Sequence, residues 1–358
     1  MSGAREVVIN EIRERGPLTF ARYMEIALYG PGVGYYATGS SRIGTRGDYF
    51  TAASMGPAFG MVIARQIEEM WRLTGCPDPF VVVEQGAGDG WLARDLMDSL
   101  SGELAAVVEF RIIEPLPNLA ARQREMLAGH AGKVAWFDGI DDLEPFVGLH
   151  VSNELIDAFP FHLLQAHGGA WRELMVGERD GSLIFLPADS SSEGVGAGLP
   201  PRPDGNLAEW RPVVGSWLRA LAGKILRGYV LAFDYGMTRP QMLDPARTRG
   251  TFACYREHRR DEDPLADPGE KDITAHVDFT GFEEAARAAG FTPLGFCPQN
   301  VYVVKAGESL LRECEGKPDH PIWRGLRGLV HPGLLGNSFH AIALAKDAPE
   351  ALSGFRTL

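Results

Sequence analysis

Two short runs of the sequence combine residue types and spacings that could form a ligand site. Residues 84–90 read EQGAGDG, in which glycine occupies every second position of the last five. Glycine has no Cβ and tolerates positive φ, so such a run can turn closely around a bound molecule. Residues 152–160 read SNELIDAFP and contain two carboxylates and an amide close together. The first run therefore suggests a ligand-binding turn, and the second suggests a polar site.

The spacing of the glycines in 84–90 distinguishes between two classes of nucleotide cofactor. A dinucleotide-binding turn has the pattern G-x-G-x-x-G, and its third glycine would fall where this sequence has Trp91. NAD is therefore the weaker prediction. Glu114 ends the next expected strand, where a carboxylate can accept both ribose hydroxyls of an adenosine. Asp138 follows the third expected strand and could accept from an adenine amino group. For both residues, a solvated carboxylate at a strand end or turn is the alternative.

Short apolar segments alternate with helical segments around these runs. Strands are predicted near 80–84, 108–114, 133–137, 148–152, 229–234, 291–296 and 339–345. Helices are predicted after Pro57, after Gly90, up to Gly129, and from a capping box of Thr280 and Glu283 to Gly290. This alternation is typical of βαβ units, so we predict an α/β fold with a mostly parallel, seven-stranded sheet and helices on both faces. Ligands of such sheets bind at the carboxyl ends of the strands, where both runs would meet.

Changes in composition divide the chain into parts. We expect an N-terminal helical cap with a glycine-rich loop at 1–76, a core at 77–160 and 216–345, an inserted antiparallel region at 161–215, and a helical insertion at 299–332. Within the inserted region, the pairs at 168–169 and 180–181 predict hairpin turns. Residues 188–206 are rich in proline, glycine and serine, so we expect poor order there.

The composition excludes several classes of function. Lysine and arginine total 35 against 47 aspartate and glutamate, and the net charge of −12 argues against binding to nucleic acid. Four cysteines without a C-x-x-C pair fit a reducing compartment. No apolar run reaches the roughly 18 residues of a membrane helix, and the charged start fits neither a signal nor a transit peptide. We predict a cytoplasmic protein, or a mitochondrial matrix protein after loss of a presequence, with no metal and no membrane or nucleic-acid partner. Its oligomeric state is not predicted.

Five stretches of the sequence resemble motifs of the MidA-like class I S-adenosylmethionine methyltransferases, a family that includes a mitochondrial complex I assembly factor which dimethylates an arginine of a partner subunit. They are GDYFT at 47–51, the glycine run at 84–90, NELIDAFP at 153–160, DYG at 234–236 and DITAHVDF at 272–279. They cover roughly residues 17–345 in the expected order. The sequence departs from the family at two places. Gln85 stands where many relatives have an apolar residue. Residues 299–332 match the family less clearly, and this second difference bears on the choice of partner more than on chemistry.

The resemblance implies a class I, Rossmann-like methyltransferase fold with S-adenosylmethionine as the cofactor. It implies that Asp48 and Thr51 cover the methionine end of this cofactor. The other residues assigned to cofactor binding are Glu84, Gly86, Gly88, Glu114, Asp138 and Asn153. Asn153 and Glu154 would line the substrate side of the methyl donor. A local role in capping a turn is the alternative for Asp48.

The resemblance also implies an enzyme that methylates an arginine side chain of a partner protein. An arginine side chain would enter the site as a cation, because the pKa of its guanidinium exceeds about 12. The carboxylates of Glu154 and Asp157 could bind this planar group through pairs of hydrogen bonds. A capping pair is the alternative for these two residues.

Methylation of a small metabolite on oxygen, nitrogen or carbon is a second possible function. It would need a general base, for which His276 and His258 are candidates. A structural role is the alternative for each histidine. A non-catalytic assembly factor that keeps the cofactor pocket is the third possibility.

Overall fold

A central sheet forms the core of the computed structural model, which describes residues 3–39, 52–188, 194–256, 259–319, 322–331 and 338–356. Three predicted site residues, Asp48, Thr51 and His258, lie outside the described residues. The sheet order is β15-β16-β10-β5-β2-β3-β4, and β14 adds a short pairing to β10. The strands are Phe80–Gln85 (β2), Val108–Ile113 (β3), Val134–Phe137 (β4), Phe146–Asn153 (β5), Ile225–Met237 (β10), Val277–Asp278 (β14), Thr292–Pro298 (β15) and Phe339–Lys346 (β16).

The strand directions confirm the predicted, mostly parallel sheet of seven strands. Neighbouring strands from β4 to β10 run parallel, whereas β16 is antiparallel to both β10 and β15. Each predicted strand is present, and β10 extends beyond the expected 229–234 at both ends. The carboxyl ends of β2, β3 and β5 therefore lie at one edge of the sheet.

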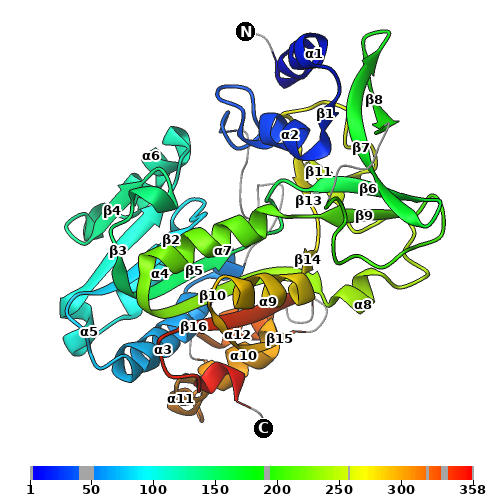
Figure 1. Ribbon diagram of the computed structural model, residues 1–358. Coiled ribbons are helices and arrows are strands. Elements are labelled where there is room, and N and C mark those ends of the chain that lie inside the picture. Colours follow the sequence, from blue (N-terminus) through cyan, green and yellow to red (C-terminus); the bar gives the residue numbers. More distant parts are fainter. Residues whose placement is uncertain are drawn as a thin grey trace.

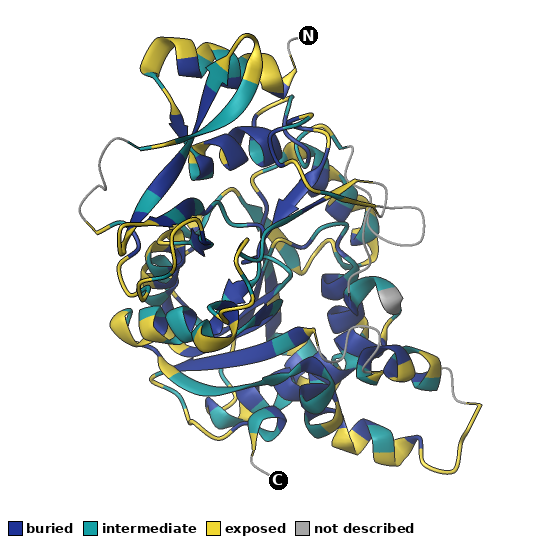
Figure 2. Cartoon of the chain, turned by 90° about the vertical axis from the view of Figure 1, so that its right-hand side faces the viewer, coloured by how far each residue is buried: buried dark blue, intermediate teal, exposed yellow. Residues whose placement is uncertain are grey.

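Helices cover both faces of this sheet (Figure 1). Successive side chains of a strand point to opposite faces, so a strand that is buried on both sides is apolar throughout. In β2, Val82 belongs to a hydrophobic cluster with residues of α3 (Ala58–Leu73) and α4 (Trp91–Ser99). Val81 and Val83 belong to another, with residues of α7 (Val213–Lys224) and α9 (Phe279–Ala288) on the opposite face. Figure 2 shows buried residues concentrated in the strands between the helices. The helices of the core are α3 (Ala58–Leu73), α4 (Trp91–Ser99), α5 (Gly102–Val107), α6 (Pro117–Met126), α7 (Val213–Lys224), α8 (Arg239–Met242), α9 (Phe279–Ala288), α10 (Gln299–Ala306), α11 (Glu308–Glu313) and α12 (Ile322–Val330).

Helix α3 begins after Pro57 as predicted, but it packs on the central sheet and not with the N-terminal cap. Its buried Phe59 shares a hydrophobic cluster with Tyr302 of α10 and Leu326 of α12. The helical segment at 299–332 therefore covers the same face of the sheet as α3. Within the described ranges, no helix is both long enough and apolar enough to span a membrane.

The start of α9 differs from the prediction. We expected Thr280 and Glu283 to form a capping box, but the N-cap residue is Asp278, whose Oδ1 accepts a hydrogen bond from the Gly281 N–H (3.0 Å). Thr280 lies inside the first turn, and its hydroxyl accepts from the Arg239 N–H (3.0 Å). An aspartate at this position satisfies an orphan helix N–H as well as threonine does, so sequence spacing alone did not distinguish the two.

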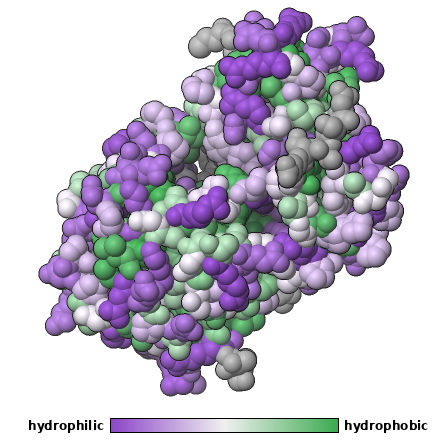
Figure 3. All heavy atoms as spheres, in the orientation of Figure 1, coloured by the Kyte–Doolittle hydropathy of each residue, from purple (hydrophilic) through white to green (hydrophobic). Residues whose placement is uncertain are grey.

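Three distant segments of the chain form a second unit beside the sheet. Phe20 from the N-terminal segment, Leu163 from the inserted region and Ile273 from a later loop share one hydrophobic cluster. The outer surface of this unit over α1 is largely hydrophilic (Figure 3). The elements are α1 (Ala4–Arg15), β1 (Leu18–Thr19), α2 (Phe20–Met24), a π-helix (Glu25–Tyr29), β6 (His162–His167), β7 (Ala170–Arg179), β8 (Ser182–Pro187), β9 (Leu207–Trp210), β11 (Ala253–Arg256), β12 (Arg259–Asp261) and β13 (Asp272–Thr274). The sequence predicted the N-terminal cap and the inserted region as two parts of the chain. In the structure, elements of both pack as one unit, which also includes part of 216–345.

Both hairpin turns predicted in the inserted region are present. Residues 168–169 connect β6 to β7, and residues 180–181 connect β7 to β8. All four turn residues have positive φ, as in the type I′ turns that suit the twist of hairpin strands. The short N-terminal strand β1 then pairs with β7, which ties the N-terminal segment to the insertion.

The predicted poor order of 188–206 is not found where the structure describes this segment. Residues 189–193 lie outside the described residues. Further along, Trp171 donates from Nε1 to the carbonyl of Pro200 (3.1 Å). Arg202 donates to main-chain carbonyls of the loop that follows α8. Contacts with distant residues thus hold a segment whose composition alone is typical of a flexible loop.

Candidate active site

A cavity of about 320 Å³ lies at the carboxyl ends of β2, β3 and β5. The core forms most of its wall, and the N-terminal segment contributes Tyr29 and Tyr36. The predicted cofactor-binding residues that line it are Glu84, Gly86, Gly88, Glu114 and Asn153. Asp138 is exposed after β4 and is not among the residues that line this cavity.

The glycine turn closes the end of the cavity between β2 and α4. Gly86, Gly88 and Gly90 have φ values of 72°, 54° and 87°, a region that residues with side chains rarely occupy. A Cβ on Gly86 would lie 2.9 Å from Cδ1 of Leu155. The positive φ of Gly86 therefore favours glycine here, and a larger side chain would also displace the Leu155 side chain beside the cavity.

Glu114 is held at the cavity wall by two hydrogen bonds. Its Oε1 accepts from the Leu116 N–H (3.0 Å), and its Oε2 accepts from Nε2 of Gln123 (2.8 Å). Gln123 also donates to the carbonyl of Gly88 (2.9 Å) and accepts from Nε1 of Trp136 (3.1 Å). Gln123 is fully buried, so this amide links the glycine turn to the carboxylate. The sequence analysis missed it; the available signal was a polar residue on the apolar face of α6.

We expect Gln123→Met to weaken S-adenosylhomocysteine binding by about 5- to 30-fold, because a lost buried hydrogen bond to a charged group costs roughly 1–2 kcal/mol. Isothermal titration calorimetry measures the change in Kd. Glu125→Met, at an exposed position of the same helix, is the matched control and should bind like the wild type. Equal affinity in both variants would show that Gln123 does not position Glu114.

Glu84 has its carboxyl group at the first cavity, and one oxygen of this group lacks a hydrogen-bond partner among the described residues. The residue is buried, and its Oε2 has no hydrogen-bond partner within the described ranges. Burial raises its pKa to about 8, and a nearby cation would favour its ionised form. S-adenosylmethionine carries an amino group, a cationic sulfur and an adenosine ribose, so Glu84 and Glu114 fit this cofactor. When bound, it supplies an electrophilic methyl group.

A second, larger cavity of about 1250 Å³ adjoins the first. Tyr36 and Glu154 line both cavities and so form their common wall. Asp157, Tyr235 and His276 line only the second cavity of the two. The structure therefore brings the predicted residues Glu154, Asp157 and His276 together at one space next to the glycine turn.

Glu154 occupies a strained position at this common wall. Its φ is 55°, which is uncommon for a residue with a side chain and is often found at functional sites. Its N–H donates to the carbonyl of Phe233 (2.8 Å), and its Oε1 accepts from Nδ2 of Asn153 (3.0 Å). Burial, with a further contribution from the negative charge of Asp157, raises the pKa of Glu154 to about 8.

Asp234 positions the turn that carries these carboxylates. Its Oδ2 accepts from the N–H groups of Ile156 (2.8 Å) and Asp157 (3.3 Å). Asp157 in turn accepts a hydrogen bond from the Tyr235 side chain, which opposes the upward shift of its pKa that burial causes. The motif DYG at 234–236 thus holds the motif NELIDAFP in place, a role that the sequence did not reveal because the two motifs are far apart in the chain.

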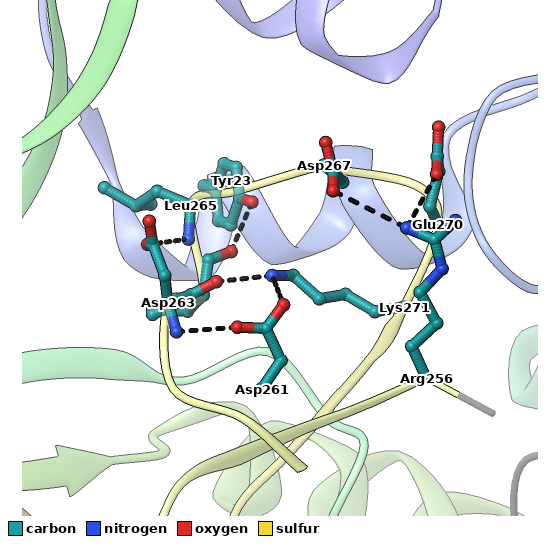
Figure 4. Close-up of polar contacts among 9 residues, drawn as sticks. Tyr23, Arg256, Asp261, Asp263, Leu265, Asp267, Glu270 and Lys271 are labelled. Atoms are coloured by element: carbon teal, nitrogen blue, oxygen red, sulfur yellow. Dashed lines mark hydrogen bonds and ion pairs between the residues drawn. The ribbon is translucent and has the colours of Figure 1, made fainter. Parts of the chain in front are cut away.

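Asp272 adds a further carboxylate to the second cavity. Its Oδ1 accepts from the Tyr36 hydroxyl (2.8 Å) at the common wall. The loop before it is held by Lys271, which is buried and donates to Oδ2 of Asp261 (2.7 Å), and by Tyr23, which donates to the carbonyl of Pro264 (2.6 Å) (Figure 4). Contacts within the second unit therefore fix the position of a residue that faces the cavity.

His276 lines the second cavity as a neutral side chain. Burial and the nearby charge of Arg247 lower its pKa to about 4. Its Nδ1 is buried and has no hydrogen-bond partner among the residues that the structure describes. The ring meets that of Tyr235 edge-on, with the centroids 5.3 Å apart. His276 could accept a proton at neutral pH, although its low pKa makes it a weak base.

Comparison with known proteins assigns the chain to a family. A family model of S-adenosyl-L-methionine-dependent methyltransferases matches residues 62–297. This chain belongs to the MidA-like family of these enzymes. The fold is similar to that of a Burkholderia thailandensis protein bound to S-adenosyl-homocysteine, with a TM-score of 0.87 and 31% identity, over 98% of this chain and 94% of that chain.

Curated relatives carry more specific names. The Caenorhabditis elegans homologue of the mitochondrial protein arginine methyltransferase NDUFAF7 is 27% identical over 77% of this chain and 70% of its own. The human protein of that name is 25% identical over 93% of this chain and 81% of its own. Together with the family match, these names establish a methyltransferase that uses S-adenosylmethionine.

The predicted cytoplasmic location is contradicted by these comparisons. The names of the Caenorhabditis elegans, Drosophila melanogaster and human relatives describe mitochondrial proteins. The prediction rested on charge and the absence of an apolar leader in the sequence. Such features do not distinguish the cytoplasm from the mitochondrial matrix, because both are reducing, aqueous compartments.

Proposed function

We propose that this methyltransferase transfers methyl groups to an arginine side chain of a partner protein. The observation that carries the proposal is the common wall of the two cavities, where Glu154 and Tyr36 line both. A methyl donor in the first cavity and an acceptor in the second would meet at Glu154. Asp157 and Asp272 make the acceptor side of this wall acidic, which suits a guanidinium.

The proposed transfer is an in-line displacement. The acceptor nitrogen forms a bond to the methyl carbon as the bond from that carbon to sulfur breaks, and the nitrogen loses one proton. Glu154 holds the guanidinium beside the wall and accepts this proton, while Asp157 holds the opposite edge of the planar group. Orientation of this kind can contribute roughly 7–11 kcal/mol to lowering a barrier. The relatives named as protein arginine methyltransferases support this acceptor.

A small-molecule acceptor is the second candidate. The observation that favours it is His276, which lines the second cavity and whose Nδ1 has no hydrogen-bond partner in the described part of the chain. A neutral imidazole could remove the proton of a hydroxyl or amine acceptor. Under this alternative, His276 and not Glu154 would control the pH dependence of transfer.

The pH profile of kcat/KM separates the two candidates. The raised pKa of Glu154, about 8, means that the free enzyme holds this carboxyl neutral below that pH and ionised above it. If Glu154 must be ionised, kcat/KM rises about tenfold per pH unit up to about pH 8 and then levels off. If His276 is the base, its lowered pKa puts the rise near pH 4. Glu154→Gln should remove the first rise, whereas His276→Ala should remove the second.

The acceptor itself can be identified with labelled S-adenosylmethionine and a lysate of the source organism. We expect one protein band to take up the label, and peptide mass spectrometry to locate the added methyl group on arginine. Label in a small molecule would favour the second candidate. A non-catalytic assembly factor would transfer no label, and its binding to a partner would persist in the Gly86→Val variant.

A further inference from the structure

We propose that Arg247 binds a carboxylate of the substrate, so that an aspartate or glutamate close to the methylated arginine is required for efficient transfer. The inference rests on the proposed function and adds a specificity-determining residue to it. Arg247 lies in the loop after α8 and lines the second cavity. None of the sequence motifs includes it.

The second cavity is lined by carboxylates at the common wall and, in the loop after α8, by Asp244, Arg247 and Arg249. Asp157 lies close enough to Glu154 for its charge to raise the pKa of that residue, and it accepts a hydrogen bond from Tyr235. The Tyr235 ring contacts His276. Arg247 is the first of the charged groups that act on His276. Asp157, the Tyr235 and His276 rings and Arg247 thus all line the same cavity, and Arg247 is near enough for its charge to act on His276.

Among the residues that the structure describes, the Arg247 guanidinium has no hydrogen-bond or ion-pair partner. Its Nε is buried, and no hydrogen bond or ion pair to its side chain is found within the ranges that the structure describes. Asp244 of the same loop uses a carboxylate oxygen to accept from the Ala246 N–H (2.8 Å). By contrast, Arg211 donates to the carbonyl of Phe159 (3.1 Å), among others. Arg247 is half-buried, and its buried Nε would gain an acceptor from an anionic ligand in the cavity.

The inserted region holds Arg247 in place. Arg202 donates from Nη2 to the carbonyls of Asp244 (2.9 Å) and Arg247 (3.2 Å). The Leu207 N–H donates to the carbonyl of Thr248 (2.9 Å). A binding group that is already ordered loses less conformational entropy when its ligand arrives. The inserted region therefore supports the main chain of the loop that carries Arg247, although it does not itself line the second cavity.

A carboxylate is the anion that this arrangement fits in a protein substrate. Arginine pairs with a carboxylate through two parallel N–H donors, which adds direction to the contact. The chain has a net charge of −12, so most of its surface repels an acidic segment. A substrate segment with both an arginine and an acidic residue would satisfy Glu154 and Arg247 at the same time.

The test uses the full-length protein, labelled S-adenosylmethionine and a synthetic peptide library with one fixed arginine and random flanking positions. Mass spectrometry of the methylated peptides shows which flanking residues are selected. We expect the wild type to enrich aspartate or glutamate at one flanking position. Arg247→Ala should lose this enrichment, and Arg247→Glu should replace it with lysine or arginine. For the best acidic peptide, KM should rise about 10- to 100-fold in Arg247→Ala with a much smaller change in kcat.

Arg249→Ala is the matched control, because Arg249 belongs to the same loop and also lines the second cavity, but its side chain is 79% exposed and pairs with Glu262 at 4.0 Å. It should keep the acidic enrichment. S-adenosylhomocysteine affinity, measured by calorimetry, should be unchanged in each variant, since neither arginine lines the first cavity. This second measurement separates a change in substrate selection from a loss of folding.

Four outcomes would overturn the inference. Arginine methylation without acidic enrichment, or with an enrichment that survives in Arg247→Ala, would contradict it and leave the proposed function standing. Equal losses in Arg247→Ala and Arg249→Ala would indicate a general effect of charge. A complete absence of methylated arginine peptides with the wild type would contradict the proposed function and this inference together.

Discussion

Glu154→Gln should lower kcat for methyl transfer by about 100- to 10,000-fold, the range expected when a group that accepts a proton in the transition state is removed. The side chain lies at the common wall of the two cavities, and its pKa of about 8 keeps it neutral at pH 7 before substrate enters. Glutamine has the same shape and charge as that neutral form. The variant should therefore fold normally and lose only the ability to ionise beside the acceptor.

Glu84→Gln is the matched control for this prediction, because Glu84 is also buried with a pKa raised to about 8 but lines only the first cavity of the two. Its main effect should be weaker cofactor binding. Transfer rates with saturating cofactor and S-adenosylhomocysteine affinities by calorimetry separate the two effects. Unchanged turnover in Glu154→Gln would contradict the role assigned to Glu154, and the acceptor would then have to be held by other groups.

Gly86→Val should abolish detectable cofactor binding. Gly86 has a φ of 72°, and a Cβ there would lie 2.9 Å from Leu155. Backbone strain of this kind costs roughly 1–3 kcal/mol, and the valine would displace the Leu155 side chain, which also lines the cavity. We expect the Kd for S-adenosylhomocysteine to rise by at least about 100-fold, because each 1.4 kcal/mol changes an affinity tenfold.

Gly290→Val provides the control for backbone strain alone. Gly290 follows α9 with a φ of 91°, and a Cβ at this position would meet no atom within 4 Å. It should lose stability in thermal unfolding while keeping its affinity for S-adenosylhomocysteine. Near-normal binding in Gly86→Val would show that the glycine turn does not form the cofactor site.

The central sheet was predictable because its signal is local. The run of valines in β2 is apolar at every position, which indicates a strand that is buried on both faces. Parallel strands place their carboxyl ends at one edge, so the positions of the glycine turn, Glu114 and Asn153 near one another followed from the order of the elements. Three of the predicted residues that line the second cavity, Glu154, Asp157 and His276, belong to recognised motifs.

The remaining parts of the site depend on contacts between residues far apart in the chain. Gln123 supports Glu114 only because α6 packs against the glycine turn. Tyr36 reaches Asp272 across more than two hundred residues of sequence. Gln123 leaves only a polar position on the apolar face of α6, which does not reveal its partners, and the contact of Tyr36 leaves no periodic pattern.

Local sequence thus specified the α/β core and the turn that fits the cofactor, because backbone conformation and the alternation of apolar residues depend on near neighbours. The substrate side formed only when the N-terminal segment, the inserted region and the loop after α8 packed together. Arg247 illustrates the difference. Its position beside the cavity comes from hydrogen bonds to the inserted region, and such long-range contacts are set by the folded chain as a whole.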